Sequence, residues 1–152
     1  MTDFESLSDE VKALVTIQRH IVTVQKYLNR LSQELQRRAL EHDLSKFSKG
    51  EFSGFVEVNR IAKEHPYPSP SLKDNKTIAL HFSRNRHHPE YHTNGIADMS
   101  LLDIVEMAID WKAASETYGN NDLKAVLAKQ QERFTMSDRH MWLIELILKE
   151  LD

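Results

Sequence analysis

The sequence predicts an all-α protein, folded as a single domain over residues 1–152 and built as a bundle of six or seven helices. Apolar residues recur at steps of three and four along most of the chain, which is the spacing of one face of a helix. No stretch alternates between apolar and polar residues as a half-buried strand does. Capping residues, prolines and glycines separate the apolar segments from one another.

The first predicted helix is long, and its apolar face is continuous. Ser6 and Asp9 form a capping box at its start. The pattern either runs unbroken to about Leu40 or breaks near Asn29. Its apolar face consists of Val11, Leu14, Val15, Ile21, Val22, Leu28, Leu31 and Leu35.

Five further helices follow in the prediction. They run from Ser48 to the prolines at 66–70, from about Asp74 to Phe82, from Leu101 to about Thr117, from about Asp122 to Phe134, and from Ser137 or Asp138 to Leu151. Ser48 with Glu51 and Ser100 with Asp103 are predicted capping boxes. The last helix is so apolar that it is a candidate interface for a homodimer.

Composition excludes several classes of protein. A net charge of -3 gives no reason to expect binding to nucleic acid. No apolar run approaches the roughly 18 residues that span a bilayer, and the acidic segment Met1–Glu5 does not resemble a signal peptide. The chain contains no cysteine, which fits a reducing compartment. We therefore expect a cytoplasmic protein with no membrane partner.

Histidines gather in one part of the chain. Of eight in total, His81, His87, His88 and His92 fall within twelve positions. Without cysteine, any metal must be held by nitrogen and oxygen ligands. In sequence order, the candidate ligands are His20, His42, Asp43, His81, His87, His88 and Asp110. They predict one or two divalent ions, chosen from Mn, Fe, Co, Zn and Mg.

Alternative interpretations exist for these residues. Exposed histidines also cluster by chance in polar loops, and His20 sits where a buried core histidine would also sit. His65 and His140 are expected to be structural or exposed. Lys46 follows the His42-Asp43 dipeptide closely, where its ammonium suits pairing with a metal-bound phosphate oxygen.

In order, these motifs resemble the HD-domain metallophosphohydrolase superfamily. Its pattern is a histidine, a His-Asp dyad, further histidines and a late aspartate on the helices of one bundle. The HD-GYP branch is similar in motif detail, since its His-Asp-x-x-Lys and His-His motifs match 42–46 and 87–88. The resemblance implies an HD-like bundle in which the dyad bridges two metals, the paired histidines are ligands and Lys46 contacts a substrate phosphate.

The chain departs from that branch in two respects. It lacks the Gly-Tyr-Pro signature, and the gaps from His20 to His42 and from His81 to His87 are short. Most of the chain also resembles a small uncharacterised family of phages and bacteria. In that family His-Asp-x-Ser-Lys-Phe, Asn-x-His-His-Pro-Glu and Glu-Met-x-x-Asp-Trp recur, here at 42–47, 85–90 and 106–111.

The predicted helix from Leu101 has an acidic face. Asp103, Glu106 and Asp110 lie within about 60° of one another around its axis. Asp110 occupies the late-aspartate position of the resemblance and is the expected ligand. Glu106 is expected to accept a hydrogen bond from a ligand imidazole or to act as a general base. Asp103 fits a solvated surface.

These features predict a metal-dependent phosphohydrolase acting on a small phosphorylated compound, most simply a nucleotide. Lys46, Asp43 and Glu106 are the expected catalytic residues, and Lys46, Arg84 and Arg86 the expected substrate contacts. Two alternatives remain open. One is a dinuclear iron oxygenase on an HD-like scaffold, and the other is a phage-encoded protein that binds a nucleotide or a host factor without turnover.

Overall fold

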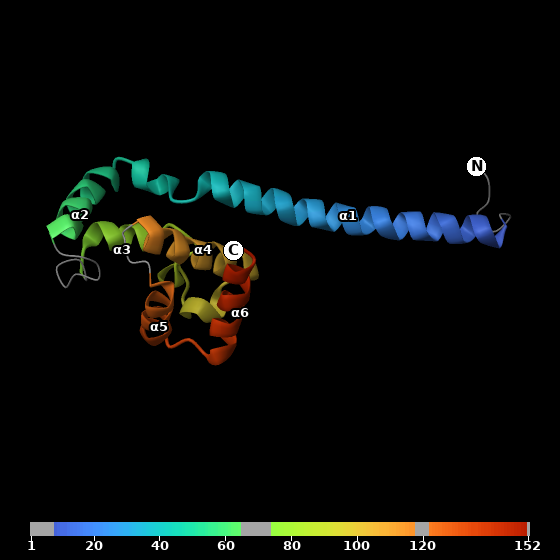
Figure 1. Ribbon diagram of the computed structural model, residues 1–152. Helices are drawn as coiled ribbons and strands as arrows, with labels where there is room; N and C mark the ends of the chain where they lie inside the picture. The colour runs from blue at the N-terminus through green and yellow to red at the C-terminus, as the bar shows by residue number, and fades with distance from the viewer. Residues whose placement is uncertain (1–7, 65–73, 118–121, 152) are drawn as a thin grey trace. The chain divides into compact units, whose positions relative to one another are not determined.

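The computed structural model describes residues 8–64, 74–117 and 122–151, and every regular element in them is helical (Figure 1). The α-helices are α1 (Asp9–Glu41), α2 (Phe52–Glu64), α3 (Lys76–Phe82), α4 (Leu101–Thr117), α5 (Leu123–Arg133) and α6 (Asp138–Lys149). Short 3-10 helices are η2 (Leu44–Phe47), η4 (Pro89–Tyr91) and η5 (Gly95–Asp98). The predicted all-α class is confirmed. None of the described helices has both the length and the apolar character needed to cross a membrane.

The chain divides into two compact units, Met1–His42 and Asp43–Asp152. The boundary falls inside the His42-Asp43 dipeptide. Described by itself, the first unit is α1, which is continuous and does not break near Asn29. Ser8 caps it by accepting a hydrogen bond from the Val11 N–H, whereas the predicted cap Ser6 lies outside the described residues.

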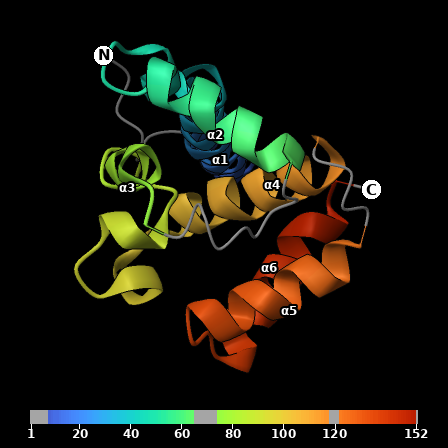
Figure 2. The same cartoon turned by 90° about the vertical axis from the view of Figure 1, so that its left-hand side faces the viewer.

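The core of the second unit is built around α4, which packs against both α5 and α6. Figure 2 shows α5 and α6 below α4. Met107 and Ala108 of α4 are fully buried, as is Ile144 of α6. Trp111 stacks on Phe134 with ring centroids 6.1 Å apart and planes 4° from parallel. This packing fixes the face of α4 that carries Glu106 and Asp110.

Much of the apolar surface of α6 belongs to this core. Ile144 and Leu148 are buried, while Trp142 and Leu146 stay exposed on the same helix. Ser137 caps α6 in a capping box with His140, so the expected structural role of His140 is confirmed. The predicted homodimer through this helix stays a prediction that rests on the exposed pair.

Of the two predicted capping boxes that lie wholly within the described residues, one is wrong. Ser100 and Asp103 do form one, because the Ser100 N–H donates to Asp103 Oδ2 and the Asp103 N–H donates to Ser100 Oγ. Ser48 and Glu51 do not form one. Helix α2 begins only at Phe52, and the Ser48 hydroxyl makes no hydrogen bond within the described residues. The Glu51 carboxylate instead contacts side chains from other segments, described below.

Because Ile144 is buried in the core and Leu146 is exposed, truncation of these two side chains on α6 should lower the free energy of unfolding by different amounts. Ile144→Ala should lower the free energy of unfolding by about 2–5 kcal/mol, because it opens a cavity beside α4. Leu146→Ala removes a similar side chain from an exposed position and should change the free energy of unfolding by about 0.5 kcal/mol or less. Urea denaturation of both variants checks this. Equal losses would contradict the assignment of the core.

Candidate metal centre

Four of the predicted ligands converge in the second unit. Asp43, His81, His87 and His88 each offer one ligand atom, and these atoms all lie within 4.8 Å of one another. Asp43 precedes η2, His81 lies in the last turn of α3, and the paired histidines lie between α3 and η4. The fold therefore brings Asp43 next to three histidines that follow it in the sequence by 38 to 45 positions.

The histidine rings of this cluster face one another in the protein interior. All three histidines are buried, with exposed fractions of 2–9%. The Asp43 Oδ1 atom lies 3.1 Å from His81 Nε2 and 3.4 Å from His87 Nε2. The buried Nε2 atom of His88 makes no hydrogen bond within the described residues. Buried polar atoms rarely lack a partner, and a divalent cation bound by nitrogen and oxygen is a partner that all four groups can share.

The charge state of His88 suits metal binding. Burial, together with the neighbouring imidazoles of His87 and His81, lowers the pKa of His88 to about 2. The ring is therefore neutral at physiological pH. A neutral imidazole presents the nitrogen lone pair that a metal requires.

The orientation of His81 is fixed by a buried carboxylate. Glu51 is fully buried, and its Oε2 atom lies 3.0 Å from His81 Nδ1. The Ser45 hydroxyl and the Arg84 guanidinium also donate to this carboxylate, at 2.9 and 3.0 Å. Burial raises the pKa of Glu51, but these hydrogen bonds outweigh it, so the pKa lies below its ordinary value. The ionised Glu51 accepts a hydrogen bond from His81 Nδ1–H, which leaves the Nε2 lone pair available to a metal.

His87 has a similar partner on its outer side. Its Nδ1 atom lies 3.2 Å from Glu106 Oε1 on α4, while its Nε2 atom faces Asp43. This geometry fits the expectation that Glu106 orients a ligand imidazole. Glu106 is not among the residues that line the cavity described below, which favours this role over that of a general base.

Asp43 itself adopts an uncommon backbone conformation. Its φ of 57° lies in the left-handed region, which aspartate tolerates better than most residues. Such conformations are retained where the surrounding structure holds them, often at functional sites. Lys46 Nζ lies 2.6 Å from Asp43 Oδ2, so the two carboxylate oxygens of Asp43 face different groups.

The other predicted ligands are placed differently. Asp110 lies on α4, and one of its carboxylate oxygens is within 4.8 Å of an Asp43 oxygen. His20 lies about a third of the way along α1, and His42 is the C-cap residue that follows the helix. Both belong to the first unit, so their part in the centre stays a prediction.

Three charged residues have structural contacts that the sequence did not suggest. Asp103 is fully buried and pairs with Arg86 at 3.2 Å, so the solvated interpretation of Asp103 is wrong. Arg84 pairs with the buried Glu51. Neither arginine is among the residues that line the cavity. The lining of the cavity therefore does not support the predicted substrate contacts of Arg84 and Arg86. The arginine that lines the cavity is Arg133.

Sequence reasoning missed the residues that support His81. Glu51 was assigned to a capping box, although its carboxylate is the main partner of that ring. Asn85 donates from Nδ2 to both Ser45 Oγ and the His81 carbonyl, at 2.9 and 2.8 Å. Ser45 and Asn85 both lie within the predicted motifs at 42–47 and 85–90, next to the candidate ligands, and this position in the sequence is the signal that could have identified them.

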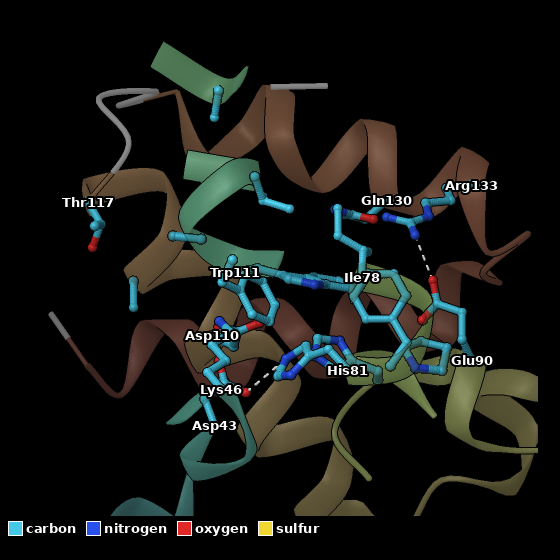
Figure 3. A pocket seen from close by; sticks show the side chains of 18 of the residues that line it. Asp43, Lys46, Ile78, His81, Glu90, Asp110, Trp111, Thr117, Gln130 and Arg133 are labelled. Carbon is cyan, nitrogen blue, oxygen red and sulfur yellow. Dashed lines mark hydrogen bonds and ion pairs between the residues drawn. The ribbon is translucent and has the colours of Figure 1, made fainter. Parts of the chain in front are cut away.

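A cavity of about 330 Å³ adjoins the cluster (Figure 3). Asp43, Lys46 and Asp110 lie together at one end of it, and Glu90, Gln130 and Arg133 lie at the other. Aromatic and aliphatic side chains from α2, α3 and α4, and from the residue that caps α5, form the walls between them: Phe55, Val58, Ile78, Phe82, Trp111 and Phe134. The volume falls within the roughly 300–1,000 Å³ of small-molecule sites.

The cluster predicts a selective loss of metal on mutation. His88→Ala removes a buried ligand and should abolish stoichiometric binding of Mn, Fe, Co or Zn, measured by elemental analysis after dialysis against each ion. His140→Ala removes a histidine that caps α6 and should retain the wild-type metal content. Stoichiometric metal in folded His88→Ala would contradict the assignment.

Comparison with known proteins gives a family without an assigned function. No curated protein and no solved structure matches the chain. Residues 9–150 match a family of unknown function (DUF5662). That match spans both units and includes every residue of the cluster. The chain belongs to this family.

Proposed function

We propose that the protein is a metal-dependent phosphohydrolase that acts on a small phosphorylated compound. The observation that carries this proposal is the position of the cluster at one end of a cavity that also contains Lys46. Asp43, His81 and His88 all line that cavity, so a metal they hold would be accessible to a ligand inside it. A bound divalent metal polarises a phosphoryl oxygen and lowers the pKa of bound water.

Lys46 supplies the positive charge that a phosphate ester requires. Its ammonium lies against Asp43 and 5.1 Å from the centre of the Phe55 ring, at the edge of the cavity. A fixed cation at this point neutralises charge that develops on the phosphate during hydrolysis. Because Lys46 also pairs with a predicted metal ligand, it links the substrate to the centre.

The apolar walls of the cavity would keep water away from a bound ligand. Phe55, Phe82 and Trp111 present apolar surface around the ligand and exclude bulk water. Exclusion of water strengthens the attraction between a phosphate and the cations beside it. Asp110 lines the same end of the cavity as Asp43, which fits its predicted role as a further ligand.

Substitution of Lys46 separates binding of the metal from turnover. Lys46→Ala should retain the metal and lower kcat on a phosphate ester. The activation free energy should rise by roughly 2–4 kcal/mol, the effect of losing one electrostatic contact in the transition state. Lys49→Ala removes an exposed lysine of the same segment and should retain full activity. The assay first screens metal-loaded wild type against nucleoside mono-, di- and triphosphates and cyclic nucleotides.

Two results would count against this function. Full activity of Lys46→Ala would remove Lys46 from the mechanism. Absence of phosphoester hydrolysis by metal-loaded wild type would contradict the proposal itself. Oxygen consumption by the iron-loaded protein would then favour the oxygenase alternative, and tight nucleotide binding without turnover would favour the binding protein.

A further inference from the structure

The cavity contains a second polar group at the end away from Asp43. Gln130 of α5 lines it, and its buried Oε1 atom makes no hydrogen bond within the described residues. A buried amide oxygen without a partner is unfavourable unless something else donates to it. The position of Gln130 inside a cavity of small-molecule size indicates that a ligand supplies the donor.

Flat side chains line the same cavity as this amide. Trp111 and Phe134 stack with their planes 4° from parallel, and Phe82 lies nearby in the same wall. The Arg133 guanidinium lies 4.8 Å from the Phe134 ring centre and 5.6 Å from that of Phe82. Glu90 holds this guanidinium through an ion pair of 2.6 Å. Aromatic and guanidinium planes favour a planar ring as their neighbour.

We propose that the ligand carries a planar heteroaromatic ring whose adjacent hydrogen-bond donor and acceptor are recognised by the Gln130 amide. A glutamine amide presents one acceptor and one donor side by side, whichever way it is turned. It is therefore complementary to the edge of a nucleobase that offers one of each. The inference rests on the proposed function, because the phosphate of the same ligand would lie at the Lys46 end.

The size of the cavity narrows the ligand class further. A volume of about 330 Å³ is close to the lower limit for small-molecule sites. This favours one base, one sugar and a single phosphate over a polyphosphate or a dinucleotide. The structure thus assigns a nucleoside monophosphate as the class of substrate and Gln130 as a residue that recognises its base.

Calorimetric binding to the metal-loaded full chain tests this subsite. The probes are AMP and CMP, whose bases each offer an adjacent donor and acceptor, and ribose 5-phosphate, which lacks a base. Gln130→Met keeps the length of the side chain and should weaken AMP and CMP about tenfold or more, while ribose 5-phosphate is unaffected. Gln131→Met, at a neighbouring residue that does not line the cavity, should bind like wild type.

The outcomes distinguish the subsite from the reaction. Three results would overturn the base subsite: equal binding of AMP and ribose 5-phosphate, no binding of either nucleotide, or no effect of Gln130→Met. None of them would contradict the proposal that the protein hydrolyses a phosphoester. Nucleotide binding that depends on Gln130, without hydrolysis of any phosphoester, would support the subsite and reject the proposed function.

A separate observation concerns α1. This helix has 33 residues and is about 50 Å long. Its apolar residues at 14, 17, 21, 24, 28, 31 and 35 alternate steps of three and four without interruption. That is the heptad pattern of a coiled-coil seam. A single helix has no means of burying such a seam by itself.

The charges on α1 favour another copy of the same helix as the partner. The positions that flank the seam are mostly uncharged, among them Gln18, Gln25 and Ser32. The one flanking carboxylate, Glu34, pairs with Arg37 and Arg38 of its own helix at 2.7 and 3.0 Å. The cations Lys12, Arg19 and Lys26 repeat every seven residues on the opposite face. Two copies would therefore meet without repulsion at the seam.

We infer that α1 associates with α1 of a second copy of this chain. The molar mass of the full chain, measured by light scattering after gel filtration, should be a multiple of the monomer mass. Ile21→Lys and Leu28→Lys place charge in the seam and should yield monomers. Gln33→Lys places the same charge on the opposite face, seven residues after Lys26, and should leave the mass unchanged.

Other results would overturn this inference. A monomeric wild type would contradict association through α1. Dissociation by Trp142→Lys on α6, with no effect of Ile21→Lys, would assign the interface to the exposed residues of α6 instead.

Discussion

The hydrogen bond between the buried Glu51 carboxylate and Nδ1 of His81 is the interaction on which the candidate centre depends. A carboxylate with no exposed surface is stable only when its charge is compensated. Here Ser45, His81 and Arg84 provide that compensation from η2, from α3 and from the segment after it. The same contacts turn His81 Nε2 toward Asp43. Glu51 thus holds three segments together and sets the direction of one ligand atom.

The cluster brings together buried polar atoms for which a bound cation would be a shared partner. Three buried imidazoles and a carboxylate oxygen face one another, and His88 Nε2 has no hydrogen bond in the described part of the chain. Glu51 and Glu106 occupy the outer nitrogens of His81 and His87. Carboxylate–histidine pairs of this kind orient ligand rings and raise their basicity. The contacts that connect Glu51 with α3 and Glu106 with His87 are therefore also the contacts that would orient the ligands of a bound metal.

The sequence predicted those features that depend on local spacing or on residue type. Periodicity gave the helices, and the absence of cysteine with paired histidines pointed to His81, His87, His88 and Asp43. The role of Glu51 was not predictable in this way, because Ser48 and Glu51 match a local capping pattern while the partner of Glu51 is 30 residues away. Asp103 was misjudged for a similar reason, since its ion pair with Arg86 arises only from tertiary packing.

The most direct test of the metal centre is anomalous diffraction from crystals of the full chain loaded with manganese or cobalt. An anomalous peak within about 2.0–2.3 Å of ligand atoms from His81, His87, His88 and Asp43 is the expected result. A peak at another group of residues, or no peak at the cluster in fully loaded protein, would contradict the account.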